Sequence, residues 1–300
     1  MKIVASLTTM PDKYHKLFDT LKSLKSQTYP LDVIYLSLPT KCRRLNIPYP
    51  PLPENIKKLC NVVKCYDYGP ITKIAGGLIE EKDPDTIILT FDDDMIYPPN
   101  LVESLVNYHN QYPVSAIGSS GMLLKYKCPM CAITPNENFF LYRIPKFNIP
   151  KTGRNVDSIF GYPGALYVRK FFPPLEKLHT EFLSLSLIDF NLFMNDDIVI
   201  SGYLSTKNIN RKIFSDVATV SFVSDDLGKR DRNSSEISYN LDIFFQRMNL
   251  AIDKCKSLNM YQKTEPMNFD ESIAMISIFI ILILILILIS AYLYYKTGVR

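Results

Sequence analysis

Three consecutive carboxylates, Asp92, Asp93 and Asp94, follow directly after the apolar segment 86–91. The β-branched and apolar residues of that segment predict a buried strand. In an open α/β sheet, ligands bind beyond the carboxyl ends of the strands, so these carboxylates would face a ligand. Three like charges this close repel one another, which favours a cation shared among them. An acidic turn that caps the following helix explains the same residues equally well.

Asp196 and Asp197 form a second acidic pair, at the start of a predicted helix. Acidic side chains there interact favourably with the helix dipole, so capping alone accounts for them. Metal-dependent group transfer also needs a second acidic group, because one set of carboxylates holds the metal and another removes a proton. Lys73 lies near the start of another predicted helix, where a cation and backbone N–H groups could bind a phosphate. An exposed surface lysine is the more ordinary interpretation of Lys73 alone.

Predicted strands and helices alternate along the chain. Apolar segments bounded by turn residues predict strands at 2–7, 32–38, 62–65, 86–91, 115–121, 211–214 and 217–223. Apolar residues at helical spacing predict helices at 14–24, 71–79, 101–106, 196–204 and 236–255. Segment 123–155 has no periodicity and predicts a long loop or hairpin region, of the kind that often covers a substrate. The order of strand, helix and strand favours a parallel sheet, so the predicted class is α/β.

Composition and charge exclude several classes of protein. The chain has 300 residues and a formal net charge of +4, with the basic residues scattered along it. Nucleic-acid-binding domains gather Lys and Arg on one face, so no nucleic-acid partner is expected. Six cysteines in a chain of this length do not form a disulfide scaffold. Cys128 and Cys131 have metal-ligand spacing, but they supply two ligands where structural zinc needs four.

A long apolar segment lies near the C-terminus. Nearly every residue from 273 to 293 is apolar, which matches the length of about 20 residues needed to cross a bilayer as a helix. We therefore expect a globular domain over 1–257, a polar linker over 258–271, a transmembrane helix over 272–293 and a short basic tail over 294–300. Only about five apolar residues precede Thr8, too few for a signal-peptide core, which favours a single-pass C-terminal anchor and a globular domain that faces the cytosol. Lys296 and Arg300, beyond the span, argue for the reverse orientation by the positive-inside rule.

Five short segments carry a family resemblance. They are Ala5-Ser6-Leu7-Thr8-Thr9-Met10-Pro11, Asp67-Tyr68-Gly69-Pro70-Ile71-Thr72-Lys73, Phe91-Asp92-Asp93-Asp94, Phe160-Gly161-Tyr162-Pro163-Gly164 and Asn195-Asp196-Asp197-Ile198. In this order, and spanning about residues 2–222, they resemble the GT-A-fold glycosyltransferases, specifically the family-2-like group. The resemblance implies an α/β domain with a mostly parallel, Rossmann-like sheet flanked by helices. It also implies a nucleotide-diphospho-sugar as donor substrate.

The resemblance gives the carboxylates separate roles. Asp92 and Asp94 would hold Mn²⁺ or Mg²⁺ on the donor diphosphate, because hard oxygen ligands bind these cations and the cation neutralises charge on the departing group. Asp197, or else Asp196, would remove the proton from the acceptor hydroxyl if the reaction inverts the sugar. A third metal ligand, often a histidine in related enzymes, is not identifiable.

The resemblance also predicts how the nucleotide is held. Thr8 would lie near the nucleotide at the end of the first strand, and Asp67 near its base or ribose. Asp93 would support the loop or the ribose, and Lys73 would stabilise phosphate.

The expected function is therefore that of a membrane-anchored, cation-dependent glycosyltransferase whose acceptor is a glycan, a lipid or a protein. A protein of the same fold that binds a sugar nucleotide without turnover, or acts as a scaffold, is the alternative. A glycoside hydrolase that uses Asp94 and Asp197 as acid and base is a third interpretation. Ile, Lys, Asn and Tyr are abundant, as in proteins from AT-rich genomes such as those of large DNA viruses or protists. If the protein is viral, the membrane would belong to the host.

Overall fold

The computed structural model describes residues 1–126, 139–143, 149–217, 220–223 and 241–262. Met1–Leu124 and Leu141–Lys263 belong to one compact unit, and it is this unit that carries the central sheet. The remaining residues form a second unit, of which the structure describes only 125–126 and 139–140.

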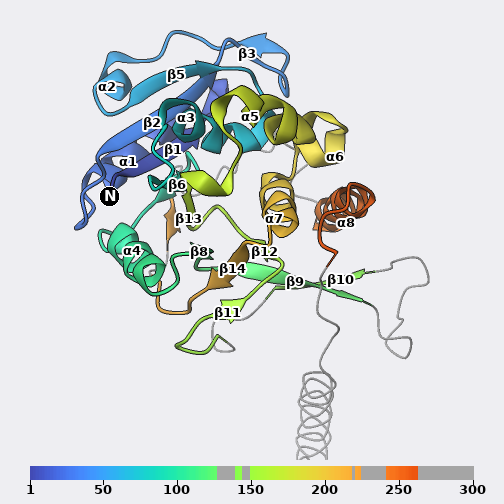
Figure 1. Cartoon of the computed structure of the whole chain (residues 1–300). Coiled ribbons are helices and arrows are strands. Elements are labelled where there is room, and N and C mark those ends of the chain that lie inside the picture. Colours follow the sequence, from blue (N-terminus) through green and yellow to red (C-terminus); the bar gives the residue numbers. More distant parts are fainter. Residues whose placement is uncertain (127–138, 144–148, 218–219, 224–240, 263–300) are drawn as a thin grey trace, which may run out of the picture. The chain divides into compact units, whose positions relative to one another are not determined.

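An eight-stranded sheet forms the centre of the first unit (Figure 1). Its strands, in spatial order, are β11 (Arg154–Asn155), β14 (Asn210–Ile213), β8 (Ser115–Gly118), β13 (Ala165–Val168), β6 (Ile87–Phe91), β1 (Ile3–Thr8), β2 (Val33–Pro39) and β5 (Asn61–Cys65). The neighbours from β6 to β5 are parallel, as are β14 and β8, whereas β13 is antiparallel to both of its neighbours and β11 is antiparallel to β14. The prediction of a mostly parallel α/β sheet is thus confirmed.

Helices cover both faces of this sheet and divide the core in two. They are α1 (Tyr14–Lys25), α2 (Glu54–Lys57), α3 (Thr72–Glu80), α4 (Leu101–Gln111), α5 (Leu175–Glu181), α6 (Phe190–Phe193), α7 (Asp196–Thr206) and α8 (Leu241–Ser257). Side chains of β1 alternate between the two cores: Val4 belongs to the core that includes residues of α3 and α7, whereas Ile3, Ala5 and Leu7 belong to the core that includes residues of α1 and α4. Each face of the sheet is therefore buried beneath its own set of helices.

Short strands and 3₁₀ turns complete the described structure. A three-stranded sheet has the order β10 (Phe139–Arg143), β9 (Gly121–Tyr126) and β12 (Ser158–Ile159). β3 (Lys41–Cys42) and β4 (Ile47–Pro48) form a hairpin, and β7 (Met95–Ile96) pairs antiparallel with the distant β15 (Ser221–Phe222). The 3₁₀ turns are η1 (Pro11–Lys13), η2 (Gly69–Ile71), η4 (Arg169–Phe171) and η5 (Leu183–Leu187). The predicted strand over 115–121 ends at Gly118. Of the one predicted over 217–223, the structure describes 217 and 220–223, and among these the strand is Ser221–Phe222.

The parallel register brings the carboxyl ends of four strands to one edge. Thr8 pairs with Ser37, Leu7 with Phe91, and Pro39 with Cys65. The loops that follow β1, β2, β5 and β6 therefore begin at the same level of the sheet. Ligand sites of open α/β sheets lie at such an edge.

Close packing of α3 on the sheet fixes the position of Lys73. The Ser6 hydroxyl donates to the Lys73 carbonyl at 2.6 Å and accepts from the Gly77 N–H at 3.0 Å. The Gly76 N–H donates to the Ser37 hydroxyl at 2.8 Å, and a Cβ at Gly76 would lie only 2.7 Å from that hydroxyl oxygen. Small residues on both elements thus let the helix backbone bond directly to β1 and β2.

The predicted transmembrane helix over 272–293 lies outside the described residues. Within the described part of the chain, no helix combines the length and the apolar character that a bilayer crossing requires.

Gly69 provides a test of the fold at the start of η2. Its φ of +79° lies in the left-handed region, and a Cβ there would stand 2.3 Å from the Phe193 carbonyl oxygen. Gly69→Ala should lower the free energy of unfolding by about 1–3 kcal/mol from backbone strain alone, and by more from the clash. Thermal unfolding of the purified full-length protein measures this change. Lys64→Ala, an exposed change on the neighbouring strand β5, should stay within about 0.5 kcal/mol of wild type; an equally small effect of Gly69→Ala would contradict the packing described.

Candidate active site

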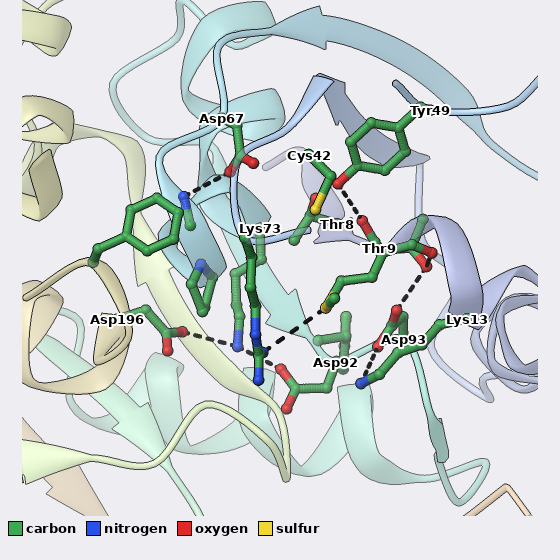
Figure 2. A pocket seen from close by; sticks show the side chains of 16 residues that line it. Thr8, Thr9, Lys13, Cys42, Tyr49, Asp67, Lys73, Asp92, Asp93 and Asp196 are labelled. Carbon is green, nitrogen blue, oxygen red and sulfur yellow. Dashed lines mark hydrogen bonds and ion pairs between the residues drawn. The ribbon is translucent and has the colours of Figure 1, made fainter. Parts of the chain in front are cut away.

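A cavity of about 250 Å³ opens at the carboxyl ends of the parallel strands (Figure 2). Its lining consists of Thr8, Thr9, Met10, Lys13, Cys42, Arg44, Tyr49, Asp67, Gly69, Pro70, Lys73, Phe91, Asp92, Asp93, Phe193 and Asp196. Six of the eight predicted site residues are in this lining. The two that are not are Asp94 and Asp197.

Lys73 lies between two carboxylates at the base of the cavity. Its Nζ contacts Asp92 Oδ1 on one side and Asp196 Oδ2, at 2.9 Å, on the other. Burial lowers the pKa of Lys73, but the charges of Asp196 and Asp92 outweigh this effect and hold the pKa well above its usual value. Lys73 is therefore a buried, charged lysine that joins β6 to α7, and its interpretation as an exposed surface lysine is wrong.

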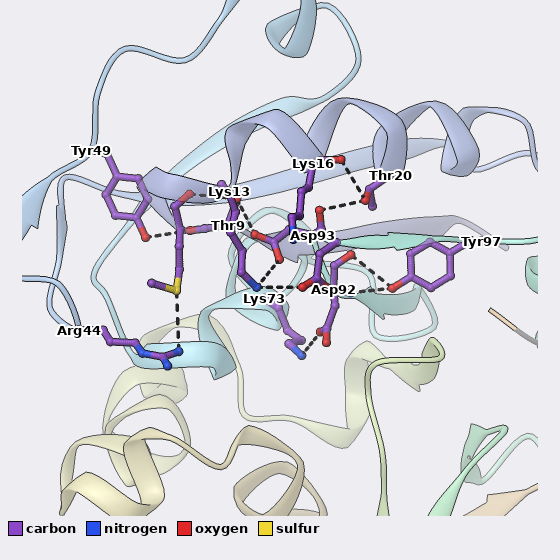
Figure 3. Close-up of polar contacts among 12 residues, drawn as sticks. Thr9, Lys13, Lys16, Thr20, Arg44, Tyr49, Lys73, Asp92, Asp93 and Tyr97 are labelled. Atoms are coloured by element: carbon purple, nitrogen blue, oxygen red, sulfur yellow. Dashed lines mark hydrogen bonds and ion pairs between the residues drawn. The ribbon is translucent and has the colours of Figure 1, made fainter. Parts of the chain in front are cut away.

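Asp93 holds the acidic loop against the first helix (Figure 3). Its Oδ2 accepts from the Thr9 hydroxyl at 2.6 Å, and its carbonyl oxygen accepts from the Thr20 hydroxyl at 2.9 Å. Lys13 Nζ lies 3.4 Å from Asp93 Oδ1 and 3.0 Å from Asp94 Oδ2. Burial raises the pKa of Asp93, and the Lys13 charge opposes that rise. Asp93 thus supports the loop, and the partner of Asp94 is Lys13.

Tyr97 connects this loop to the loop that precedes β13. Its hydroxyl accepts from the Asp92 N–H at 2.8 Å and lies 3.1 Å from the Tyr162 carbonyl oxygen, to which it donates. Burial raises the pKa of Tyr97 well above its usual value, so the hydroxyl keeps the proton that it donates. Tyr97 therefore fixes the backbone that carries Asp92.

Asp196 and Asp197 point in different directions. Asp196 lines the cavity beside Lys73. Asp197 Oδ1 instead accepts from the Gly161 N–H at 2.9 Å, and the Asp197 carbonyl accepts from the Ser158 hydroxyl at 3.0 Å. Burial raises the pKa of Asp197 well above its usual value and the charge of Asp196 adds to the rise, against the opposing charge of Lys73. The sequence favours Asp197 as the base, but the carboxylate that faces the cavity is Asp196.

Asp67 and Thr8 hold the opposite end of the cavity. Asp67 Oδ1 accepts from the Gly69 N–H at 2.8 Å, and Oδ2 accepts from the Arg43 N–H at 2.7 Å. The Thr8 hydroxyl donates to the Ser37 carbonyl at 2.8 Å. Both side chains thus line the cavity while they tie together the loops that enclose it.

Several lining residues are absent from the sequence-based prediction. They are Thr9, Met10, Lys13, Cys42, Arg44, Tyr49, Gly69, Pro70, Phe91 and Phe193. Cys42, Arg44 and Tyr49 come from or follow the β3–β4 hairpin, within a stretch that the sequence assigns only as loop. The one feature of the sequence that points to these three residues is their position soon after the strand β2, whose carboxyl end lies at the site.

The cavity provides some of the oxygen ligands that a divalent cation needs. Among the described residues, no group of three or more His, Cys, Asp or Glu side chains is placed to hold a metal. Mg²⁺ is commonly held by one or two carboxylates together with substrate phosphates, so a full protein cage is not required. One lysine shared by Asp92 and Asp196 leaves negative charge uncompensated, and the Asp92 side chain is 29% exposed. Asp92 fits as a ligand, whereas Asp94 lies outside the lining and is paired with Lys13.

Comparisons with known proteins identify the fold. No family model matches the chain, and no curated protein matches it. A crystal structure of GalNAc-T7 with UDP, GalNAc and Mn²⁺ is similar over 75% of this chain and 44% of that one, with a TM-score of 0.50 and 12% identity. The chain thus spans less than half of that structure. A crystal structure of S. aureus TarS 1-349 has a TM-score of 0.43 and 13% identity over 88% of this chain and 67% of that one. The likeness to GalNAc-T7 shows the fold alone, and the predicted GT-A fold is confirmed.

Asp197→Asn tests the burial of that carboxyl group. Because the pKa of Asp197 is raised in the folded protein, the wild type loses stability as pH rises from the unfolded pKa, about 3.9, through the folded one. An amide cannot ionise and can still accept from Gly161, so the variant should melt a few degrees higher than wild type at pH 7.5, with the gain shrinking toward pH 4. Thermal unfolding at both pH values measures this. Asp85→Asn, at an exposed site, should show no such trend; a gain that is larger at pH 4 would refute the assignment.

Proposed function

We propose that the protein is a glycosyltransferase that moves a sugar from a nucleotide-diphosphate donor to an acceptor hydroxyl. The observation that supports this most is the meeting of Asp92, Lys73 and Asp196 in one cavity at the carboxyl edge of a GT-A sheet. Such an edge holds ligands in open α/β folds, and the three groups there can bind a diphosphate and take up a proton.

The donor would lie along the cavity with its nucleoside toward Thr8 and Asp67 and its diphosphate toward Lys73 and Asp92. A cation, Mn²⁺ or Mg²⁺, would be held by Asp92. The sequence also predicts Asp94 as a ligand, which would require its carboxylate to leave Lys13. When bound, it would neutralise charge on the departing diphosphate. The structure of GalNAc-T7, which has UDP and Mn²⁺ bound, motivates the choice of donor and cation.

The proton of the acceptor hydroxyl would pass to a carboxylate of α7. Asp196 is the better placed of the two, because it faces the cavity and Lys73 stabilises its charge. Asp197, the residue that the sequence favours, is held by the Gly161 N–H outside the lining. The hydrolase interpretation needs Asp94 and Asp197 across a sugar-binding cleft, and neither residue lines the cavity.

Donor turnover tests this function. Full-length protein purified in detergent should release UDP or GDP from at least one nucleotide sugar in the presence of Mn²⁺ and a glycan, lipid or protein acceptor. Asp92→Asn should lower the rate roughly 100-fold or more, because several kcal/mol of charge stabilisation would be lost. Asp94→Asn should do the same if Asp94 is the second ligand.

Three outcomes would overturn parts of the proposal. Undiminished turnover in EDTA, or full activity of both aspartate variants, would refute the cation assignment. Nucleotide-sugar binding without turnover on a broad panel would favour the binding or scaffolding alternative. Hydrolysis of simple glycosides without a nucleotide would favour a hydrolase. Asp85→Asn, exposed and distant from the cavity lining, serves as the matched control.

We also propose that segment 272–293 anchors the enzyme in a membrane, with the globular domain in the cytosol. The support is the length and apolar character of that segment. Protease added to sealed microsomes that carry the full-length protein should digest the globular domain. Protection of the domain until detergent is added would refute the proposed orientation. Release of the protein by alkaline carbonate would refute the proposed membrane anchor.

A further inference from the structure

Two of the three cations that line the cavity are already paired with carboxylates. Lys73 is shared by Asp92 and Asp196, and Lys13 is shared by Asp93 and Asp94. Each ammonium thus faces two negative charges of the protein itself. An anionic ligand that relied on these lysines would compete with carboxylates already in contact with them.

Arg44 is the third cation of the lining, and its surroundings differ (Figure 3). Among the described residues it forms no ion pair, and its one described hydrogen bond runs from a terminal nitrogen to the Met10 sulfur at 3.8 Å. A thioether is a weak acceptor, whereas a guanidinium carries five N–H donors. Most of the hydrogen-bonding capacity of Arg44 is therefore open to a ligand.

The hairpin that carries Arg44 is anchored on both sides of the cavity. The Tyr49 hydroxyl donates to the Thr9 carbonyl at 2.9 Å, and the Tyr49 N–H donates to the Thr40 carbonyl at 3.2 Å. The Arg43 N–H donates to Asp67 Oδ2 at 2.7 Å. The Arg43 bond ties the turn between β3 and β4 to the residues after β5, and the Tyr49 hydroxyl ties the residue after β4 to the end of β1. The Arg44 side chain is thus carried by a backbone that is fixed before a ligand arrives.

We infer that Arg44 binds the diphosphate of a nucleoside diphosphate in this cavity. The inference rests on the proposed function and adds to it a residue that holds the donor. A planar guanidinium can form two parallel N–H···O bonds to phosphate oxygens, which a lysine cannot do. The cavity lining contains four carboxylates, those of Asp67, Asp92, Asp93 and Asp196, so a diphosphate that enters it needs a cation that they do not already occupy.

Arg43 offers a matched control one residue away. Its guanidinium lies 5.4 Å from the ring centre of Tyr66 and 5.3 Å from that of Phe193, and it does not line the cavity. Arg43→Met removes the same charge from the same hairpin and keeps the backbone N–H that binds Asp67. A loss of affinity caused only by the net charge of the hairpin would appear equally in both variants.

The test compares diphosphate and nucleoside binding. Titration calorimetry of the full-length protein in the presence of Mn²⁺ with UDP, GDP, CDP and ADP selects the tightest ligand, which is then compared with its own nucleoside. Arg44→Met should weaken diphosphate binding by about 10- to 100-fold, as expected for loss of charge-assisted hydrogen bonds, and change nucleoside binding by less than about twofold. Arg44→Lys should recover only part of the loss, and Arg43→Met should bind both ligands like wild type.

The remaining outcomes separate this inference from the proposed function. Equal loss for diphosphate and nucleoside would mean that Arg44 reads the base or ribose and would overturn the inference. Unchanged diphosphate binding by Arg44→Met, or a loss of the same size in Arg43→Met, would also overturn it while the proposed function stands. Failure of the wild type to bind any of the four diphosphates would overturn the proposed donor, and the role of Arg44 with it. Thermal unfolding of each variant confirms that the fold is intact.

Discussion

The buried ammonium of Lys73, held between Asp92 and Asp196, is the interaction on which the rest of the site depends. An ion removed from water loses several kcal/mol of solvation, so this lysine is stable only where carboxylates stand close by. The end of β6, the first turn of α3 and the first turn of α7 must therefore meet at one point. Direct bonds from α3 to Ser6 and Ser37 hold the helix at the depth that this meeting requires.

The residues of this central ion cluster could be predicted because each is marked by local sequence. Asp92 follows an apolar strand, and Lys73 and Asp196 begin helices, which makes each a candidate, but the ion pairs among them depend on the tertiary fold. Arg44 and Tyr49 carry no comparable mark. Their place in the cavity depends on a short hairpin held by hydrogen bonds to residues far away in the chain. Non-local contacts of this kind produce no periodic pattern of residues from which they could be predicted.

The adjacent aspartates show a second limit of prediction from sequence. Asp92 faces the cavity, Asp93 is buried against Thr9, and Asp94 turns to Lys13. One turn of backbone, fixed by Tyr97, gives three identical side chains three different environments. Spacing alone predicts that a cation is near, but it cannot say which oxygen atoms are free to bind one. The same reasoning separates Asp196 from Asp197, because a helix directs consecutive side chains about 100° apart.

The balance of charge in the cavity lining explains these observations together. Four carboxylates and three cations line it, and both lysines among the cations are shared between two carboxylates. A cavity with this balance repels a free anion, since the field of the unshared carboxylate charge is strengthened where water is excluded. It would become complementary to a diphosphate only with more positive charge, such as the cation proposed at Asp92 and the guanidinium of Arg44, which no carboxylate of the described residues neutralises. If the proposed donor binds here, its diphosphate and the acidic residues would be compatible only with added positive charge between them, so cation and donor would bind cooperatively through the same electrostatics that keep Lys73 charged.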